Sequence, residues 1–302
     1  MAPASDSTRP TALVTGRNGF TGRYVGAALE EAGYRVVGLQ DPESVRDVDL
    51  LDRDGLRRVV EAAAPDVVVH LAAISFVAHD DAASIYQVNV VGTRNLLEAL
   101  ASASHRPRVV VLASSANIYG NATADPIVEQ APPAPANDYA VSKLAMEHVA
   151  RLWMDRLPIV VTRPFNYTGV GQHVNFLIPK IVDHFRRRAA TIELGNTAVS
   201  RDFSDVRTVA DAYRRLVERP PLGEVVNICS GEAHSLGDVL QWMQELAGYR
   251  IEVRVNPAFV RASEIARLVG SKAKLESVIG PIASIPLPET LRWMYEAPGA
   301  AV

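Results

Sequence analysis

Short runs of β-branched residues alternate with longer stretches of helical spacing through the first half of the chain. The runs are Ala12–Val14, Arg35–Val37, Asp66–Val69, Val109–Leu112 and Pro158–Val161. Helical spacing of apolar residues covers Tyr24–Ala32, Leu56–Ala63, Ala83–Ala101 and Tyr139–Met154. Continuous apolar strands that alternate with helices predict a parallel sheet covered on both faces. We therefore expect an α/β protein built on a doubly wound Rossmann sheet.

After about Pro164 the pattern changes to loops rich in Gly, Asn and Pro between shorter elements. Helices are expected over Ile178–Arg188, Val209–Glu218, Leu236–Ala247 and Lys272–Ile279, and strands over Val225–Ile228 and Ile251–Val255. We interpret residues 11–165 as the Rossmann domain. Residues 166–298 are interpreted as mainly a smaller, C-terminal substrate-binding lobe, interleaved with returns to the first domain. A crevice between the two is the natural ligand site.

Composition excludes several kinds of partner. The net charge of the 302 residues is -3 and basic residues are scattered, which argues against binding to nucleic acid or to an anionic membrane. Cys229 is the only cysteine, so no intrachain disulfide is possible and a reducing compartment fits. The first ten residues lack an apolar stretch, and no run approaches the ~20 apolar residues of a membrane span. We expect a cytoplasmic protein without a metal site.

Three glycines follow the first predicted strand and open the first helix. Gly16, Gly19 and Gly22 are spaced Gly-x-x-Gly-x-x-Gly, one residue longer than the usual dinucleotide fingerprint. Glycines let the backbone approach a pyrophosphate, whose charge is met by amides at the helix N-terminus. Alone they would equally mark a tight turn, but the strand–loop–helix context favours a dinucleotide. Its expected contacts here are Gly16, Arg17, Asn18, Gly19, Phe20 and Gly22.

The sequence leaves the choice between NADP and NAD open, with NADPH favoured. An NAD enzyme usually places an acid at the end of the second strand, to hold the ribose hydroxyls. Asp41 could serve, yet Gln40 stands at the better register. Arg17 could meet a 2′-phosphate, or it could be a solvated loop arginine.

Further cofactor contacts are expected after the second and third strands. Asp49 and Leu50 are candidates for the adenine, although Asp49 could instead cap a helix. Leu71, Ala72 and Ala73 end the third strand, where small residues would let the cofactor pass. The preceding His70 is interpreted as a buried, hydrogen-bonded core histidine rather than a catalyst.

Ser115, Tyr139 and Lys143 are the candidate catalytic residues. A tyrosine and a lysine four apart share one helix face, so the ammonium can lie beside the phenol. A phenol titrates near pH ~10 in water, and a neighbouring cation is expected to lower that pKa. A serine hydroxyl can share the proton and orient a substrate oxygen. Such a trio suits proton transfer to a ketone or from an alcohol while a nicotinamide moves the hydride.

With these residues in place, the chain resembles the extended short-chain dehydrogenase/reductase family that acts on nucleotide sugars, the NAD-dependent epimerase/dehydratase family. The resemblance runs from about Thr11 to the C-terminal helix, through the motifs Thr15–Gly22, His70–Ala73, Asn89–Thr93, Ser114–Gly120, Tyr139–Lys143 and Arg163–Asn166. It implies that Tyr139 is the acid/base, that Lys143 lowers its pKa and holds the nicotinamide ribose, and that Ser115 binds the reacting oxygen. Asn89 is implied in the cofactor site.

The same resemblance places the nucleotide sugar on the second lobe. It implies that Asn166 contacts the diphosphate, Arg201 the nucleotide, Arg261 a phosphate and Glu264 the ribose hydroxyls. Guanidinium groups bind phosphate bidentately, although a surface ion pair is the alternative for each arginine. Ser75 near the sugar and Lys180 near the base are further candidates.

Two differences from the motifs of other members of the family narrow the choice of reaction. The family's 4,6-dehydratases carry acidic residues at the positions that Ala116 and Asn117 occupy here. The side chains of Ala116 and Asn117 cannot act as a general acid or base. Its epimerising reductases use a cysteine in this segment, whereas Cys229 lies far downstream. A 4-ketoreductase or a 4-epimerase remains. The second half most resembles GDP-4-keto-6-deoxy-D-mannose reductases, which make GDP-D-rhamnose, although Ala262 replaces the usual proline after Arg261.

We therefore expect NAD(P)H-dependent reduction of the C4 ketone of GDP-4-keto-6-deoxymannose or a close analogue. The alternative is a nucleotide-sugar 4-epimerase that retains NAD. A remote alternative is a non-catalytic NADP-sensing regulator, but such relatives lose the tyrosine or the lysine.

A homodimer is also expected. In the family, the helix that carries the tyrosine and the helix around Val90–Leu100 pack against their twofold mates. Leu144, His148, Leu152 and Trp153 could line such a face, or they could belong to an intrachain core.

Overall fold

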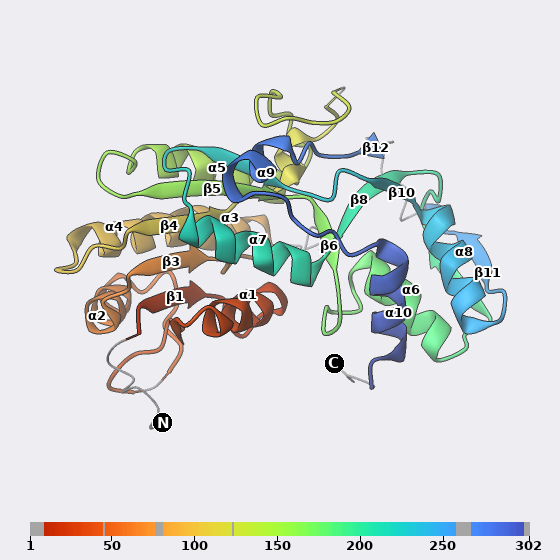
Figure 1. The fold of residues 1–302 in the computed structure, drawn as a ribbon, viewed down its shortest axis with the longest axis horizontal. Helices are drawn as coiled ribbons and strands as arrows, with labels where there is room; N and C mark the ends of the chain where they lie inside the picture. The colour runs from red at the N-terminus through yellow and green to blue at the C-terminus, as the bar shows by residue number, and fades with distance from the viewer. Residues whose placement is uncertain (1–8, 45, 76–80, 123, 258–266, 299–302) are drawn as a thin grey trace.

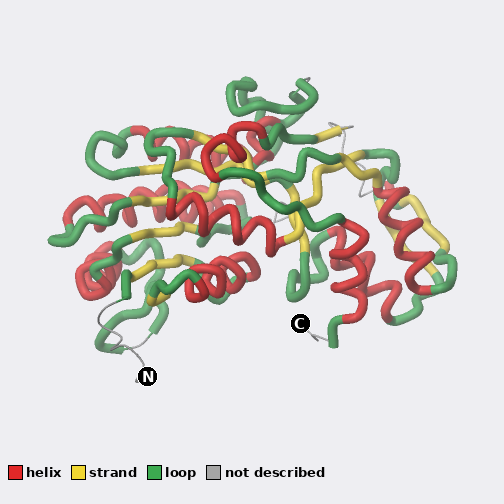
Figure 2. Tube along the Cα trace, in the orientation of Figure 1, coloured by secondary structure: helices red, strands yellow, loops and turns green. Residues whose placement is uncertain are grey.

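The computed structural model describes residues 9–44, 46–75, 81–122, 124–257 and 267–298. Its largest element is a parallel six-stranded sheet in the order β2–β1–β3–β4–β5–β9 (Figures 1 and 2). The strands are β1 (Thr11–Thr15), β2 (Arg35–Val37), β3 (Val67–His70), β4 (Val109–Ala113), β5 (Ile159–Pro164) and β9 (Val225–Ile228). All five predicted runs of the first half form strands of this sheet, which confirms the expected α/β class.

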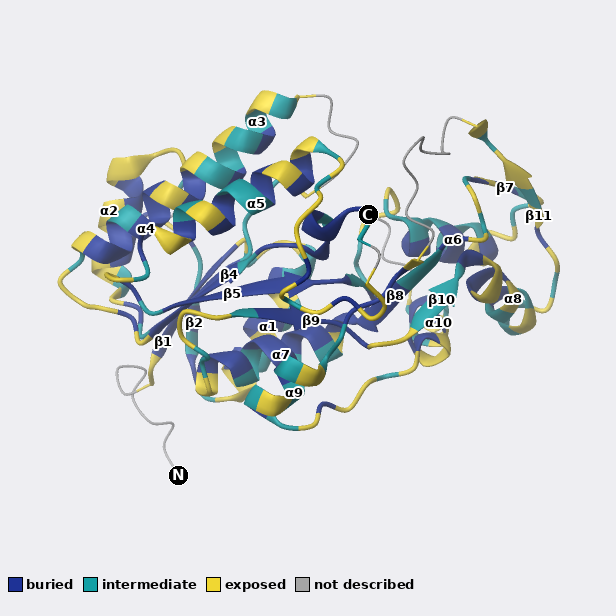
Figure 3. Cartoon of the chain, turned by 90° about the horizontal axis from the view of Figure 1, so that it is seen from above, coloured by how far each residue is buried: buried dark blue, intermediate teal, exposed yellow. Residues whose placement is uncertain are grey.

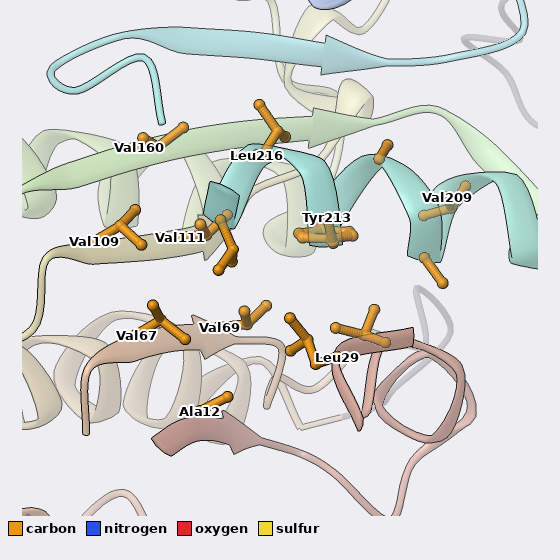
Figure 4. Close-up of a cluster of buried hydrophobic side chains, with 14 of the residues drawn as sticks. Ala12, Leu29, Val67, Val69, Val109, Val111, Val160, Val209, Tyr213 and Leu216 are labelled. Atoms are coloured by element: carbon orange, nitrogen blue, oxygen red, sulfur yellow. The ribbon is translucent and has the colours of Figure 1, made fainter. Parts of the chain in front are cut away.

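Helices cover both faces of the sheet, because successive residues of each strand point apolar side chains to opposite sides. One layer consists of α1 (Phe20–Glu31), α7 (Val206–Glu218) and α9 (Ala273–Ile279). The opposite layer consists of α2 (Arg53–Ala63), α4 (Thr93–Ser102) and α5 (Asp138–Arg151). Figure 3 shows the buried strands between these layers. In Figure 4, Val67, Val69, Val109 and Val111 point from the sheet toward Leu29 and Tyr213.

The helix expected over Ala83–Ala101 is interrupted. It divides into α3 (Ala82–Tyr86), a π-helical turn over Gln87–Gly92, and α4. A side chain at Gly92 would lie 2.7 Å from the Cβ of Leu50, so the turn packs closely on its neighbour. Within the turn, the Asn89 side chain bonds to the backbone of Ile74. Such wide turns inside helices often lie at functional sites.

A second region carries a smaller sheet and a separate core. β8 (Ser200–Asp205) pairs with β6 (Asn166–Thr168), β10 (Ala233–Ser235) and β12 (Arg267–Leu268). A parallel pair, β7 (Thr191–Leu194) with β11 (Glu252–Val255), packs with α6 (Leu177–Arg186), α8 (Leu236–Ala247) and α10 (Leu287–Glu296). The sequence did not predict β6, β7, β8, β10 or β12. β8 reads Ser-Arg-Asp-Phe-Ser-Asp, which contains no β-branched residue.

Elements of the second half return to the first sheet. β9 pairs with β5, α7 packs against α1, and α9 contacts both α7 and β9. β6 follows β5 after a single residue and pairs with β8, so the chain passes directly from the large sheet to the small one. The second half of the chain thus returns to the large sheet, while the division into two domains at residues 165 and 166 stays a prediction. No helix in the described ranges is long and apolar enough to cross a bilayer.

Candidate cofactor and catalytic site

The order of the large sheet reverses at β1, with β2 on one side of it and β3 on the other. In open parallel sheets, ligands bind beyond the carboxyl ends of the strands at such a reversal. The carboxyl end of β1 carries the loop that begins at Gly16, and the end of β3 carries Leu71–Ala73. These two segments are in contact, since a Cβ on Gly16 would lie 3.0 Å from the amide nitrogen of Ala72.

The glycine loop forms a cradle that side chains would fill. Gly16 has a φ of +68°, which favours glycine, and a Cβ on Gly22 would lie only 2.1 Å from the carbonyl oxygen of Gly16. Gly19 precedes α1 and provides no side-chain cap for its first amides. The bare backbone and the uncapped helix start fit the pyrophosphate of a dinucleotide. Arg17, Asn18 and Phe20 lie in this loop or at the first position of α1.

The end of β2 does not offer a free acid. The Asp41 carboxylate accepts hydrogen bonds from the amides of Glu43 and Ser44, both at 3.0 Å, and from Arg58 Nη2 at 3.0 Å. The bond from the Ser44 amide, followed by the one from Arg58, lowers the pKa of Asp41 to about 2. Asp41 thus holds its own loop together. Gln40 is exposed and forms a backbone bridge with Asp47.

Arg17 lies at the same place. Its side-chain carbons are 3.8 and 4.0 Å from the position of a Cβ on Gly38, just after β2. Its guanidinium donates to Glu30 at 2.9 Å, in an ion pair whose side chains are 41% and 50% exposed. Exposed pairs of this kind contribute little to stability, so the guanidinium can exchange partners at low cost.

The expected adenine contacts have local structural roles. Asp49 accepts from the Leu51 amide at 2.8 Å, whereas Asp52 caps α2 through the Gly55 amide at 2.9 Å. The capping role weighed for Asp49 is therefore wrong. Leu50 is buried, and its carbonyl accepts from Asn95.

The candidate catalytic residues meet beyond the carboxyl end of β4. Ser115 begins a single 3₁₀ turn over Ala116–Tyr119, and its Oγ accepts from the Asn117 amide at 3.1 Å. Tyr139 and Lys143 lie one turn apart on α5, which Asn137 caps. The Ser115 side chain is hydrogen-bonded to the Tyr139 phenol. Lys143 Nζ lies 6.0 Å from the centre of the Tyr139 ring and donates to the Ala113 carbonyl at 2.8 Å.

Burial controls the proton affinities of this trio. Burial raises the pKa of Tyr139 above its ordinary value, and the hydrogen bond with Ser115 opposes that rise only in part. Burial, rather than Lys143, is the largest influence on the pKa of Tyr139 in this structure, so the expected lowering of that pKa by Lys143 stays a prediction. Burial also lowers the pKa of Lys143 to about 8, while the Glu147 carboxylate acts in the opposite direction. At neutral pH the site therefore holds a protonated phenol beside a mostly protonated amine.

Asn89 lies between the cofactor loops and the catalytic helix. Its Oδ1 accepts from the Ile74 amide at 2.9 Å, and its Nδ2 donates to the Ile74 carbonyl at 3.1 Å. Nδ2 also donates to Ser142 Oγ at 3.0 Å, between Tyr139 and Lys143 in sequence. Asn89 thus orients the chain after β3 relative to α5.

The expected substrate residues are only partly brought together. Asn166 on β6 stands opposite Phe203 on β8, two residues beyond Arg201, so Asn166 and Arg201 share one face of the small sheet. Lys180 Nζ donates to the Glu193 carbonyl at 2.8 Å, and Ser75 is exposed. Arg261 and Glu264 lie outside the described residues.

A cavity of about 310 Å³ lies elsewhere, beside α5 and β9, and Glu129, Glu147 and Lys274 are among the residues that line it. It contains none of the expected cofactor, catalytic or substrate residues, so we give it no role in this chemistry.

Tyr167 was not predicted as a site residue. Its hydroxyl is 2.8 Å from Thr21 Oγ1 in the first turn of α1, and its ring stacks on Phe20 with centroids 6.1 Å apart. It joins β6 to the start of α1 beside the glycine loop. The only sequence signal is its position next to Asn166.

Comparison with known proteins identifies the family. Residues 12–229 match the model of the NAD dependent epimerase/dehydratase family, and the chain belongs to this family. It is 36% identical to a GDP-6-deoxy-D-talose 4-dehydrogenase of Aggregatibacter actinomycetemcomitans, over 89% of this chain and 90% of that protein. It is 35% identical to a GDP-6-deoxy-D-mannose reductase of Pseudomonas aeruginosa, over 93% and 94% of the two chains.

Solved structures agree with the fold. A Burkholderia cenocepacia J2315 protein, provisionally described as an epimerase, is 52% identical, with a TM-score of 0.90 over 96% of this chain and 98% of that one. RMD from Pseudomonas aeruginosa, complexed with NADPH, is 34% identical, with a TM-score of 0.86 over 95% and 97% of the chains. A nicotinamide dinucleotide is therefore the cofactor class for this site.

Proposed function

We propose that the protein reduces the C4 ketone of a GDP-activated 4-keto-6-deoxy sugar, with NADPH as the reductant. The observation that carries the proposal is the convergence of Ser115, Tyr139 and Lys143 in a buried site near the glycine cradle. The names of the two relatives, both acting on GDP-6-deoxy sugars, support the substrate class.

The chain's own groups supply the proton and hold the substrate oxygen. A bound nicotinamide supplies the hydride to C4. Tyr139, whose raised pKa keeps the phenol protonated at neutral pH, gives its proton to the carbonyl oxygen as that oxygen gains charge. Ser115 donates a hydrogen bond to the same oxygen, and the Lys143 ammonium stabilises the tyrosinate left behind. The ketone thereby becomes a secondary alcohol.

The residues after Ser115 argue against dehydration, because Ala116 and Asn117 offer neither an acid nor a base. A 4-epimerase would use the same trio and differ by retaining its cofactor. The GDP-sugar oxidoreductases among the relatives favour the reductase.

Two observations support NADPH. Asp41, the acid that could hold free ribose hydroxyls, is already engaged by two amides and Arg58. Arg17 instead lies at the end of β2, where the adenosine ribose binds in this fold, and a guanidinium suits a 2′-phosphate. The structure of RMD with NADPH is consistent with this choice.

The nucleotide sugar is proposed to bind against the second region, residues 166–298. Asn166 and Arg201, which share a face of the small sheet, would contact the diphosphate and nucleotide. The proposed further contacts are Ser75, Lys180, Arg261 and Glu264. Arg201 bonds to the Ser200 carbonyl at 2.9 Å, so substrate binding would redirect its guanidinium.

A cytoplasmic homodimer is the proposed assembly. Of the four residues expected at the twofold face, His148 and Leu152 are exposed, and Leu152 is 79% exposed. Trp153 and Leu144 pack inside the chain instead. The face proposed for the partner is therefore narrower than expected from the sequence.

The test follows nicotinamide absorbance with freshly made GDP-4-keto-6-deoxymannose and either NADPH or NADH. Stoichiometric oxidation of NADPH by the wild type, with none by Tyr139→Phe, is the expected result. If neither cofactor is oxidised and a nicotinamide dinucleotide copurifies with the protein, the reductase proposal would be wrong and a 4-epimerase would take its place.

A further inference from the structure

Five buried polar side chains form a continuous hydrogen-bonded path from the glycine loop to the catalytic helix. Thr15 Oγ1 is 2.7 Å from His70 Nδ1, and His70 Nε2 is 2.9 Å from Thr93 Oγ1. Thr93 bonds to the Asn89 carbonyl, Asn89 Nδ2 to Ser142 Oγ, and Ser142 Oγ to the Tyr139 carbonyl at 2.7 Å. Each of the five side chains is at most 3% exposed. Nothing in the proposed chemistry uses His70, Thr15 or Thr93.

The Thr15 end fixes the direction of the first bond. Thr15 Oγ1 already accepts hydrogen bonds from the amides of Leu71 at 3.1 Å and Ala72 at 3.0 Å. A hydroxyl has two acceptor lone pairs and one proton. Because both lone pairs are occupied, the Thr15 proton must be donated to His70, and His70 Nδ1 must be an acceptor.

The Thr93 end fixes the state of the other ring nitrogen, Nε2. Thr93 Oγ1 lies 2.7 Å from the Asn89 carbonyl oxygen, which can only accept, so the Thr93 hydroxyl donates there. The Thr93 oxygen is then an acceptor for His70, and Nε2 must carry a hydrogen. The Thr93 end requires a hydrogen on Nε2 and the Thr15 end excludes one from Nδ1, so the two ends together require neutral imidazole with its proton on Nε2.

The hydrogen bonds around His70 exclude a second proton on the imidazole ring. A hydrogen on Nδ1 would point at the Thr15 hydroxyl, whose lone pairs are both occupied. The hydroxyls of Thr15 on β1 and Thr93 on α4 face the imidazole, and among the described residues Lys143 on α5 is the charged group that acts on it. Burial, followed by the charge of Lys143, lowers the pKa of His70 to about 3.

We propose that His70, held as the Nε2–H tautomer, is a positioning residue that fixes the cofactor cradle relative to the catalytic helix. On one side it orients Thr15, which holds the Leu71 and Ala72 amides against Gly16. On the other it orients Thr93 and the π-helical turn whose Asn89 holds Ile74 and Ser142. The segment from Leu71 to Ile74 is thus held by hydrogen bonds at both ends, by Thr15 at its start and by Asn89 at Ile74. The role rests on the proposed function, because it serves the same nicotinamide site.

The test uses a matched pair at Thr93. Thr93→Val keeps the shape but removes the acceptor of the His70 proton and the donor to Asn89, whereas Thr93→Ser keeps both. We expect Thr93→Val to bind NADPH about five- to tenfold more weakly, the cost of one or two buried hydrogen bonds, and Thr93→Ser to bind close to wild type. Binding is measured by titration of the purified full chain, whose fold is checked by circular dichroism. Equal affinity in all three proteins would overturn the proposal.

The tautomer is tested separately by nitrogen NMR of the ¹⁵N-histidine-labelled protein. The signals of His70 among the seven histidines are assigned with His70→Gln. We expect a protonated Nε2, an unprotonated Nδ1 and no titration between about pH 5 and pH 8, a range in which an ordinary histidine titrates. A proton on His70 Nδ1, or a His70 titration midpoint near the ordinary histidine pKa, would contradict the proposal. Neither readout requires turnover, so a protein that meets both expectations yet reduces no keto sugar would refute the proposed function alone.

Discussion

Arg163 and Glu147 meet in two parallel hydrogen bonds although their side chains are only 4% and 2% exposed. Arg163 Nε lies 2.9 Å from Glu147 Oε1, and Nη2 lies 2.7 Å from Oε2. Arg163 Nη1 also donates to the Tyr119 hydroxyl and to the Glu129 carbonyl, each at 2.9 Å. Glu147 stands one turn after Lys143 on α5, and Arg163 lies near the end of β5. The pair therefore joins the catalytic helix to the sheet.

We predict that Glu147→Gln strongly destabilises the protein. The substitution leaves a buried guanidinium without its counter-charge, which typically costs about 3–5 kcal/mol. The free energy of unfolding in urea measures this loss. Glu252→Gln is the matched control, since Glu252 pairs with Arg254 at the surface and such pairs contribute little. A loss in Glu147→Gln no greater than in the control would contradict the prediction, and Glu147→Gln/Arg163→Met should recover part of the stability.

Tyr139→Phe should fold normally and lose turnover. The ring remains, so its packing is kept, while the proton donor and the bond to Ser115 are removed. Loss of a general acid typically lowers the rate by about 10²- to 10⁴-fold. Single-turnover oxidation of NADPH measures the chemical step, and NADPH titration measures binding. Unchanged turnover would remove Tyr139 from the chemistry.

The strands of the large sheet could be predicted from the sequence because burial on both faces requires unbroken apolar runs, as in Val67–His70 and Val109–Ala113. The trio and the glycine loop were predictable because their chemistry is tied to fixed spacing along one helix or one turn. The capping of α8 by Ser235 and Asp238 is likewise local.

What escaped prediction depends on contacts between distant residues. β8 is a buried strand although it contains Asp202, because the Asp202 carboxylate accepts from the amides of Ser230 and Gly231, both at 2.9 Å. The Asp41 carboxylate is bound in part by the guanidinium of Arg58, seventeen residues away in the sequence. Gly92, which ends the π-helical turn, packs closely against Leu50, forty-two residues before it in the chain. No local pattern carries these pairings, so propensity alone misassigns the segments.

Arg17→Ser should change the cofactor preference. If the guanidinium holds a 2′-phosphate, its loss removes a charge-assisted contact worth about 1.5–3 kcal/mol, or roughly 10- to 150-fold in KM for NADPH. The KM for NADH should change little, because NADH lacks the phosphate. Steady-state kinetics with both cofactors gives the ratio. The matched control is Glu30→Gln, which removes only the ion-pair partner of Arg17 and should not weaken NADPH binding. An equal increase in KM for NADPH and NADH in Arg17→Ser would contradict the prediction, because it would indicate a general disturbance of the glycine loop.

Lys143 should give both activity and stability a dependence on alkaline pH. Burial lowers its pKa from 10.5 to about 8, so kcat/KM, which reports groups of the free enzyme, should fall above about pH 8 as the ammonium is lost. The folded-state pKa lies below the unfolded value. Folding is therefore penalised while the lysine is protonated, fully below about pH 8, and the penalty is relieved as the pH rises toward 10.5.

Lys143→Met, which has no titrating group at this position, provides the comparison. The free energy of unfolding of the wild type, relative to this variant, should rise between about pH 8 and pH 10. Urea unfolding at several pH values measures the difference. A difference that stays constant over that range would show that Lys143 titrates at its ordinary pKa and that burial does not control its charge.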